Sequence, residues 1–132
     1  DFNKSIELDP QYAESYCKRG YSKCKLNDYI DAIEDFNKSI ELDPQYAEAY
    51  CNRGFSKIEL KDYIGAIEDF NKSIEFDPYY ALAYCLRGIA KSALKDMSGA
   101  VSDLNKASEL GFVKADDVLK TLKSENSTDH LE

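Results

Sequence analysis

A 34-residue period runs through this sequence and constrains what the chain can fold into. Residues 1–12, DFNKSIELDPQY, return unchanged as residues 35–46. Residues 13–46 match residues 47–80 at 25 of 34 positions, and a third copy, residues 81–114, keeps 16 of 34 identities to the second. A repeat of this length indicates a structure built from stacked copies of one supersecondary unit.

Each copy is predicted to contain two helices. The first half carries a glycine, Gly20, Gly54 or Gly88, inside its helix. A mid-helix glycine costs about 1 kcal/mol relative to alanine, so we expect the partner helix to approach closely there. In the second half, apolar residues recur at steps of three and four, which is typical of a helix with one buried stripe. In the first copy these are Tyr29, Ala32, Ile33, Phe36 and Ile40.

The helix boundaries are equally periodic. Asp28, Asp62 and Asp96 precede the second helices, where a short carboxylate side chain can cap free backbone amides. Pro44 and Pro78 each follow an aspartate, which predicts that the second helices of the first two copies end there. In the third copy a Gly-Phe pair replaces Asp-Pro, which predicts a left-handed glycine cap and the end of the array.

This order of residues resembles the tetratricopeptide repeat, a 34-residue helix–turn–helix unit. The resemblance implies an all-α fold, a right-handed superhelical solenoid of stacked antiparallel helix pairs. The third copy departs from the signature, with leucine in place of phenylalanine and phenylalanine in place of proline. The signature residues are Tyr16, Gly20, Ala32, Phe36 and Pro44 in the first copy, and Tyr50, Gly54, Ala66, Phe70 and Pro78 in the second.

The period also predicts how the chain is divided. The first segment looks like the second helix of a truncated repeat, so we expect the chain to be a fragment of a longer array. An amphipathic helix after the third copy fits the polar cap that a solenoid needs at its end. The predicted parts are 1–12 (truncated repeat), 13–46, 47–80 and 81–112 (three repeats, the third divergent), 113–123 (capping helix) and 124–132 (disordered tail or tag remnant).

Charge and composition exclude several classes of function. Seventeen Lys and Arg against 25 Asp and Glu leave a net charge of −8, which opposes binding to nucleic acid or to an anionic membrane. The amino terminus lacks a signal peptide, so a cytoplasmic protein is expected. The only histidine is His130, so the chain cannot assemble a histidine-based triad or a multi-histidine metal site. We therefore predict no enzyme activity and no cofactor.

Four cysteines raise the question of redox or metal chemistry. Cys17, Cys51 and Cys85 recur at one repeat position, and Cys24 follows seven residues after Cys17. Packed helices lie about 8–10 Å apart, whereas a disulfide needs Cα atoms within about 7 Å. Free thiols in a reducing compartment are expected. A soft-metal or redox ladder is the alternative to small groove-lining residues, although no CxxC spacing is present.

A row of arginines allows two interpretations as well. Arg19, Arg53 and Arg87 precede the repeat glycine and could bind anions. Each copy also carries an aspartate at a matching place in its second helix, which favours a charge-assisted structural pair between the two helices. The aspartates are Asp35, Asp69 and Asp103.

The resemblance implies a concave groove lined by the first helix of each repeat, where a protein or peptide partner would bind. This groove is expected to be aromatic and aliphatic with few charges, which is typical of a partner site. Packing of Tyr21, Phe55 and Ile89 against a neighbouring repeat is the alternative. The candidate groove residues are Glu14, Cys17, Lys18, Tyr21, Glu48, Cys51, Asn52, Phe55, Ile58, Leu82, Cys85, Leu86 and Ile89.

Chaperone-binding members of the family hold a terminal carboxylate with a clamp of Lys, Asn and Arg side chains. Only Asn52 matches that clamp here. Where the clamp needs cations, this chain has Cys17 with Tyr21 and Leu82 with Leu86. A free carboxylate would find little to pair with, so binding of a chaperone tail is disfavoured.

A second hypothesis assigns the repeats to structure rather than to peptide binding. The segment of residues 1–12 lacks the upstream helix that would normally cover Phe2, Ile6 and Leu8. Another copy could stack on this end, which would make the chain a spacer or a self-association module.

Overall fold

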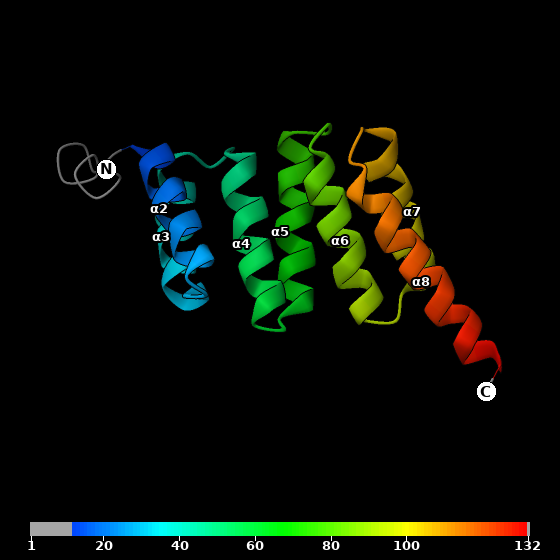
Figure 1. Ribbon diagram of the computed structural model, residues 1–132. Helices are drawn as coiled ribbons and strands as arrows, with labels where there is room; N and C mark the ends of the chain where they lie inside the picture. The colour runs from blue at the N-terminus through cyan, green and yellow to red at the C-terminus, as the bar shows by residue number, and fades with distance from the viewer. Residues whose placement is uncertain (1–11, 132) are drawn as a thin grey trace. The chain divides into compact units, whose positions relative to one another are not determined.

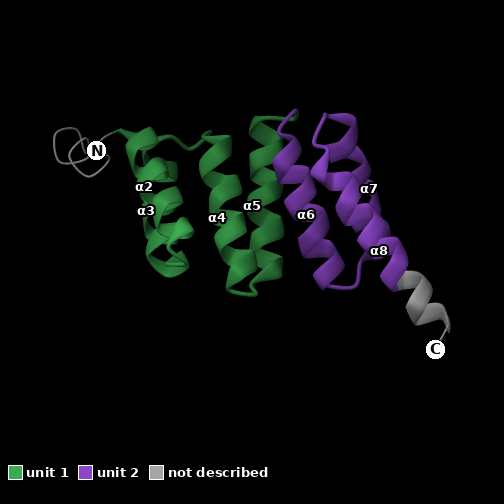
Figure 2. Ribbon diagram, in the orientation of Figure 1, with its two compact units in different colours: residues 1–78 green, residues 79–132 purple. Residues whose placement is uncertain are grey.

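The computed structural model describes residues 12–131, with side chains described up to Glu125. Seven helices and no strand occupy this part of the chain, which is an all-α helical repeat solenoid (Figure 1). The chain divides into two compact units, residues 1–78 and 79–132 (Figure 2). The helices are α2 (Ala13–Lys25), α3 (Tyr29–Leu42), α4 (Ala47–Glu59), α5 (Tyr63–Phe76), α6 (Ala81–Ala93), α7 (Met97–Glu109) and α8 (Lys114–Leu131).

The predicted caps are confirmed. Asp62 and Asp96 each accept a hydrogen bond at 3.0 Å from the backbone N–H three residues later, and Asp28 accepts the equivalent bond at 3.4 Å. These bonds satisfy an amide that has no partner inside the helix. At the other ends, Asp43 and Asp77 have extended backbones, because the proline after each disfavours helical geometry.

The predicted close approach at the repeat glycines is also confirmed. A Cβ placed on Gly20 or on Gly54 would lie 2.6 Å from the ring of Phe36 or of Phe70. Both rings are fully buried. The bare backbone of the first helix therefore makes room for a phenylalanine of the second, which offsets the helix propensity lost at glycine.

In unit 1, α2 pairs with α3, α4 pairs with α5, and α3 packs against α4. The core of the first pair consists of small residues around one ring, with Ala49 of α4 reaching into it from the next pair. Tyr29, Ile40, Tyr46 and Phe55 are partly buried against this core. Its buried members are Cys17, Cys24, Ala32, Phe36 and Ala49.

In unit 2, α6 pairs with α7, and α8 packs against α7. Gly111, at a φ of 96°, provides the predicted left-handed cap, and the N–H of Phe112 donates to the carbonyl of Ala107 at 3.0 Å. Leu119 and Leu122 of α8 then join Leu104 in the core of this unit.

Helix α8 differs from its predicted extent. The sequence predicted a capping helix over 113–123 and a disordered tail from residue 124, but the backbone stays helical to Leu131. The segment predicted to be a disordered tail or tag remnant thus continues helix α8 as far as Leu131. No glycine or proline follows Gly111, so nothing in the sequence ends the helix once it has begun. Within residues 12–131, no helix is long and apolar enough to cross a membrane.

Candidate functional site

The first helices of unit 1, α2 and α4, carry nine of the predicted groove residues. Two of them, Cys17 and Cys51, are 1% and 0% exposed. In unit 2, Cys85 is 3% exposed. The prediction that these three thiols line an open groove is wrong, because the cysteine position lies beneath the surface among packed helices. All four cysteines are free, and no metal-binding group of His, Cys, Asp and Glu forms within the described residues.

Burial makes the thiols of Cys17 and Cys85 poor nucleophiles. It raises the pKa of Cys17 to about 12, with Glu48 and Glu14 contributing to the same shift. Burial also raises the pKa of Cys85. Cys17 and Cys85 therefore stay protonated at neutral pH, and they react poorly because the thiolate is the reactive form.

We use the name first-helix face for the side chains that remain accessible on α2 and α4 of unit 1. Three of them, Glu14, Lys18 and Glu48, are charged. The members are Glu14, Lys18, Tyr21, Glu48, Asn52, Phe55 and Ile58.

The two glutamates of this face make equivalent contacts. The Tyr12 hydroxyl donates to Glu14 at 2.9 Å, and the Tyr46 hydroxyl donates to Glu48 at 3.3 Å. Glu14 also forms an ion pair with Lys18 at 2.7 Å. Hydrogen bonds from Lys18 and Tyr12 lower the pKa of Glu14. Each carboxylate is thus held in place by a tyrosine that precedes its helix.

The aromatic residues of the face differ in exposure. Tyr21 is 49% exposed, and the Lys25 ammonium lies 4.9 Å from its ring centroid. Phe55 is half-buried and meets the edge of Tyr29 with ring centroids 6.2 Å apart. The alternative of packing against a neighbouring repeat therefore describes Phe55 better than Tyr21. Ile58 is half-buried too.

Asn52, the residue that matched the carboxylate clamp, is engaged within the chain. Its amide Nδ2 donates to the Cys17 sulfur at 3.7 Å. On α6 of unit 2, Leu82, Leu86 and Ile89 are half-buried, and Ile89 packs against the core of that unit.

The arginine row is confirmed as a set of structural pairs. Arg53 binds both carboxylate oxygens of Asp69, at 3.0 and 2.7 Å, and Asp69 is 3% exposed. The same two-bond geometry joins Arg19 to Asp35 and Arg87 to Asp103. The guanidinium of each arginine also lies about 5.5 Å from a tyrosine ring of its own helix.

A lysine completes each of these clusters, and sequence reasoning missed it. Lys23, Lys57 and Lys91 approach the same carboxylates, each at 3.0 Å. The signal was present, because these lysines recur four residues after each arginine and so lie on the same helix face.

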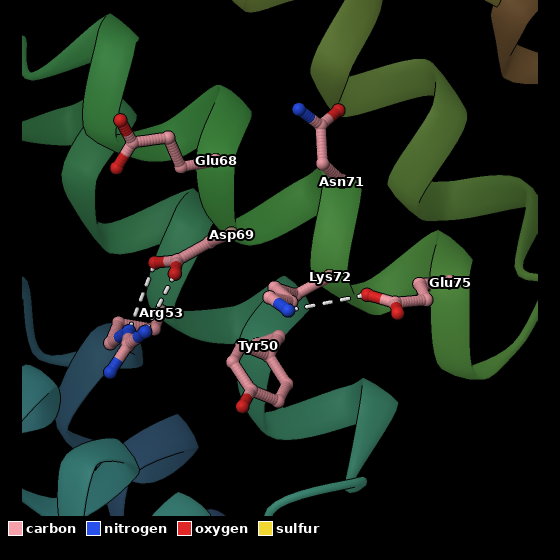
Figure 3. Close-up of a pocket in the computed structure, with 7 residues that line it drawn as sticks. All are labelled: Tyr50, Arg53, Glu68, Asp69, Asn71, Lys72 and Glu75. Carbon is pink, nitrogen blue, oxygen red and sulfur yellow. Dashed lines mark hydrogen bonds and ion pairs between the residues drawn. The ribbon is translucent and has the colours of Figure 1, made fainter.

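An open pocket of about 470 Å³ lies between α4 and α5 (Figure 3). Figure 3 shows the Arg53–Asp69 pair on one side and Tyr50 near the paired Lys72 and Glu75 on the other. Unit 2 has an equivalent pocket of about 370 Å³, at the positions 34 residues later. Both are lined by the structural ion pairs, so we assign them to the repeat framework.

The proposed self-association residues Phe2, Ile6 and Leu8 lie outside the described residues.

Three models of one protein family match the chain. A TPR repeat model matches residues 20–60, and two tetratricopeptide repeat models match residues 47–80 and 2–34. The chain belongs to the tetratricopeptide repeat (TPR) family. No curated protein sequence gives a significant match.

Several solved TPR structures are similar to this one. The first TPR domain of human RPAP3 gives a TM-score of 0.85 at 25% identity, covering 93% of this chain and 98% of that one. The first TPR of Spaghetti (RPAP3), bound to the HSP90 peptide SRMEEVD, gives 0.83 at 26%, covering 90% and 96%. A crystal structure of MamA gives 0.78 at 26%, covering 86% and 68%.

Proposed function

We propose that this chain is a protein-interaction scaffold that binds a peptide segment of a partner through its first helices. The observation that carries the proposal is the first-helix face of unit 1. It keeps a half-exposed aromatic ring, Tyr21, above a core that is already complete without it. Exposed aromatic side chains with two rotatable angles are favoured contact residues in protein interfaces.

The similar structures support this proposal. Two TPR domains related to this chain at 26 and 27% identity are bound to the peptide SRMEEVD. Stacked repeats form extended surfaces of the kind that such segments use. The proposed binding surface of unit 1 is the first-helix face, and the corresponding candidate residues of unit 2 are Leu82, Leu86 and Ile89 on α6.

Selection from a random heptapeptide display library, with the whole chain as target, tests the proposal. Tyr21→Ser removes the exposed ring. Ile64→Ser is the matched control, because Ile64 is 66% exposed on the second helix α5. We expect the selected peptides to bind Tyr21→Ser roughly tenfold more weakly or worse. Binding to Ile64→Ser should equal that to the unmodified chain. Peptides that depend on Ile64 and ignore Tyr21 would place the site elsewhere and overturn the proposal.

A further inference from the structure

The first-helix face carries a charge pattern that narrows the class of partner. We infer that it binds an extended segment in which a basic side chain, lysine or arginine, lies next to an apolar one. The basic group pairs with Glu48 and Glu14, and the apolar group packs on Tyr21 and Phe55. This inference rests on the proposed function and names the chemistry of its partner.

Glu48 lies in the first turn of α4. This carboxylate is exposed and accepts a hydrogen bond from the neutral Tyr46 hydroxyl at 3.3 Å. Among the described side chains, no cation lies within ion-pair distance of Glu48, whereas Glu14 has Lys18 at 2.7 Å. Lys18 senses Glu48, which helps to raise the pKa of that lysine, but its direct ion pair is with Glu14. Glu48 therefore offers a negative charge, already oriented by a tyrosine, that has no direct ion-pair partner among the described side chains.

Glu14 and Glu48 influence the same two groups electrostatically. Both raise the pKa of the Cys17 thiol, and both raise the pKa of the Tyr46 hydroxyl. The geometry agrees for Glu48, because its carboxylate lies 3.3 Å from the Tyr46 hydroxyl and Tyr46 packs against the core that contains Cys17. A cation above Cys17 would be attracted by charges from two successive repeats.

An acidic residue in the first turn is not required for a helix of this kind to form. An acidic residue in the first turn of a helix is stabilised by the helix dipole, and this effect would explain Glu14 and Glu48 on α2 and α4. Helix α6 has Leu82 at that position and no acidic residue in its first turn, yet it has the same 13-residue length. The glutamates are therefore not needed to form the helix.

Two further charged side chains belong to this side of unit 1. The Lys25 ammonium lies against the Tyr21 ring, and Glu59 contributes to the raised pKa of Cys24 and of Tyr29. With Glu14, Glu48 and Lys18, this side carries three carboxylates against two ammonium groups. A segment ending in acidic residues would be repelled, and the Asn52 amide is already directed at Cys17. Charge complementarity thus favours a basic group beside the aromatic surface.

Charge reversal at Glu48 tests the inference. Heptapeptides are selected from a random library on the whole chain, and their affinities are measured by fluorescence anisotropy for the chain and for Glu48→Lys. Glu34→Lys is the matched control, because Glu34 is an exposed glutamate on the second helix α3 and the change in net charge is the same. Circular dichroism melting confirms that each variant is folded.

The expected peptides contain lysine or arginine next to an apolar residue. They should bind Glu48→Lys roughly fivefold to tenfold more weakly, bind Glu34→Lys unchanged, and weaken with added salt. Replacing the peptide's basic residue with glutamate should restore binding to Glu48→Lys. Peptides that require Tyr21 but carry no basic residue and ignore Glu48→Lys overturn the inference and leave the proposed function intact. If no selected peptide requires Tyr21, the proposed function fails, and the inference fails with it.

Discussion

The helix pairs of unit 1 and of unit 2 have different apolar side chains at the equivalent core position, the one that faces the glycine of the first helix. In unit 1, Phe36 and Phe70 press their rings on Gly20 and Gly54. In unit 2 the equivalent side chain is Leu104, whose Cγ would lie 3.0 Å from a Cβ on Gly88. Leu104 and both phenylalanines are fully buried. The pairing of two helices therefore tolerates either phenylalanine or leucine at the position that faces the glycine.

The ion clusters show no such difference. All three helix pairs contain an arginine with two bonds to a buried aspartate and a lysine at 3.0 Å. The Arg–Asp–Lys cluster is therefore the part of the repeat that stays the same in both units. Its directional hydrogen bonds fix how the two helices align. The apolar residue at the glycine is adjusted to its neighbours, and in unit 2 those include α8.

The largest effect is expected from breaking one cluster in each unit. Arg53→Met keeps much of the side-chain volume but leaves Asp69 buried with Lys57 alone. Breaking a buried pair from one side costs about 3–5 kcal/mol, and the remaining lysine places this case near 3 kcal/mol. Arg87→Met should lower the free energy of unfolding by a similar amount. Urea unfolding measures both, and a much smaller loss in one unit would show that the clusters are not equivalent.

Raising the pH above 9 should lower the free energy of unfolding by up to about 2 kcal/mol, and the buried thiol of unit 1 should contribute more to this loss than that of unit 2. The pKa of Cys17 is about 12 in the folded chain, raised from 9.0. The unfolded thiol thus ionises first, so the stability is fully present below pH 9 and declines as the pH rises toward 12. The slope reaches at most about 1.4 kcal/mol per pH unit.

Cys17→Ala isolates this effect from the ionisation of other groups. The stability difference between the chain and Cys17→Ala, measured by urea unfolding between pH 8 and about pH 10.5, should narrow as the pH rises. Cys85→Ala is the comparison in unit 2, where burial alone raises the thiol pKa, and its difference should narrow less. If the stability of Cys17→Ala and that of the unmodified chain fell in parallel as the pH rises, the pH dependence would not come from the Cys17 thiol.

Much of the fold was predictable from the sequence, because its determinants repeat. The aspartate caps, the glycine contacts and the Arg–Asp pairs each involve residues of one repeat, so the 34-residue period displayed them three times. Burial of Cys17 was not predictable in this way. It depends on Asn52 and Ala49 of the following repeat, and no pattern within one copy reports those contacts.

The candidate site was predicted only as a set of positions. Periodicity indicated which residues lie on the first helices, but Tyr21 and Phe55 occupy equivalent positions and differ in packing, because Tyr29 covers Phe55. The length of α8 was missed for another reason. The polar composition of residues 124–132 suggested disorder, although a sequence without glycine or proline can extend a helix that has already begun.

A smaller effect is expected at the glycines, with different sizes in the two units. Gly54→Ala places a Cβ 2.6 Å from the Phe70 ring, and the buried ring must shift. Overpacking of this kind costs about 1–3 kcal/mol, and the gain in helix propensity returns roughly 1 kcal/mol. We expect a net loss of up to about 2 kcal/mol. Gly88→Ala meets its neighbours at 3.0 Å and should be closer to neutral.

Phe70→Leu provides the control for this prediction, since it introduces into unit 1 the side chain that unit 2 already has. In a double-mutant cycle by urea unfolding, Gly54→Ala combined with Phe70→Leu should cost less than the sum of the two single changes. Strict additivity would mean that the ring is not what the glycine accommodates.

The smallest effect is expected in the turns between paired helices. Asn27, Lys61 and Lys95 all have left-handed backbones, with φ of 61°, 66° and 69°. Asparagine tolerates this conformation better than lysine, and glycine adopts it without strain. Lys61→Gly and Lys95→Gly should each raise the free energy of unfolding by about 0.5–1 kcal/mol, while Asn27→Gly should change it by less. Thermal unfolding of the three variants measures the order. A larger gain at Asn27 than at Lys61 would show that contacts of these side chains, rather than backbone strain, set the stability of the turn.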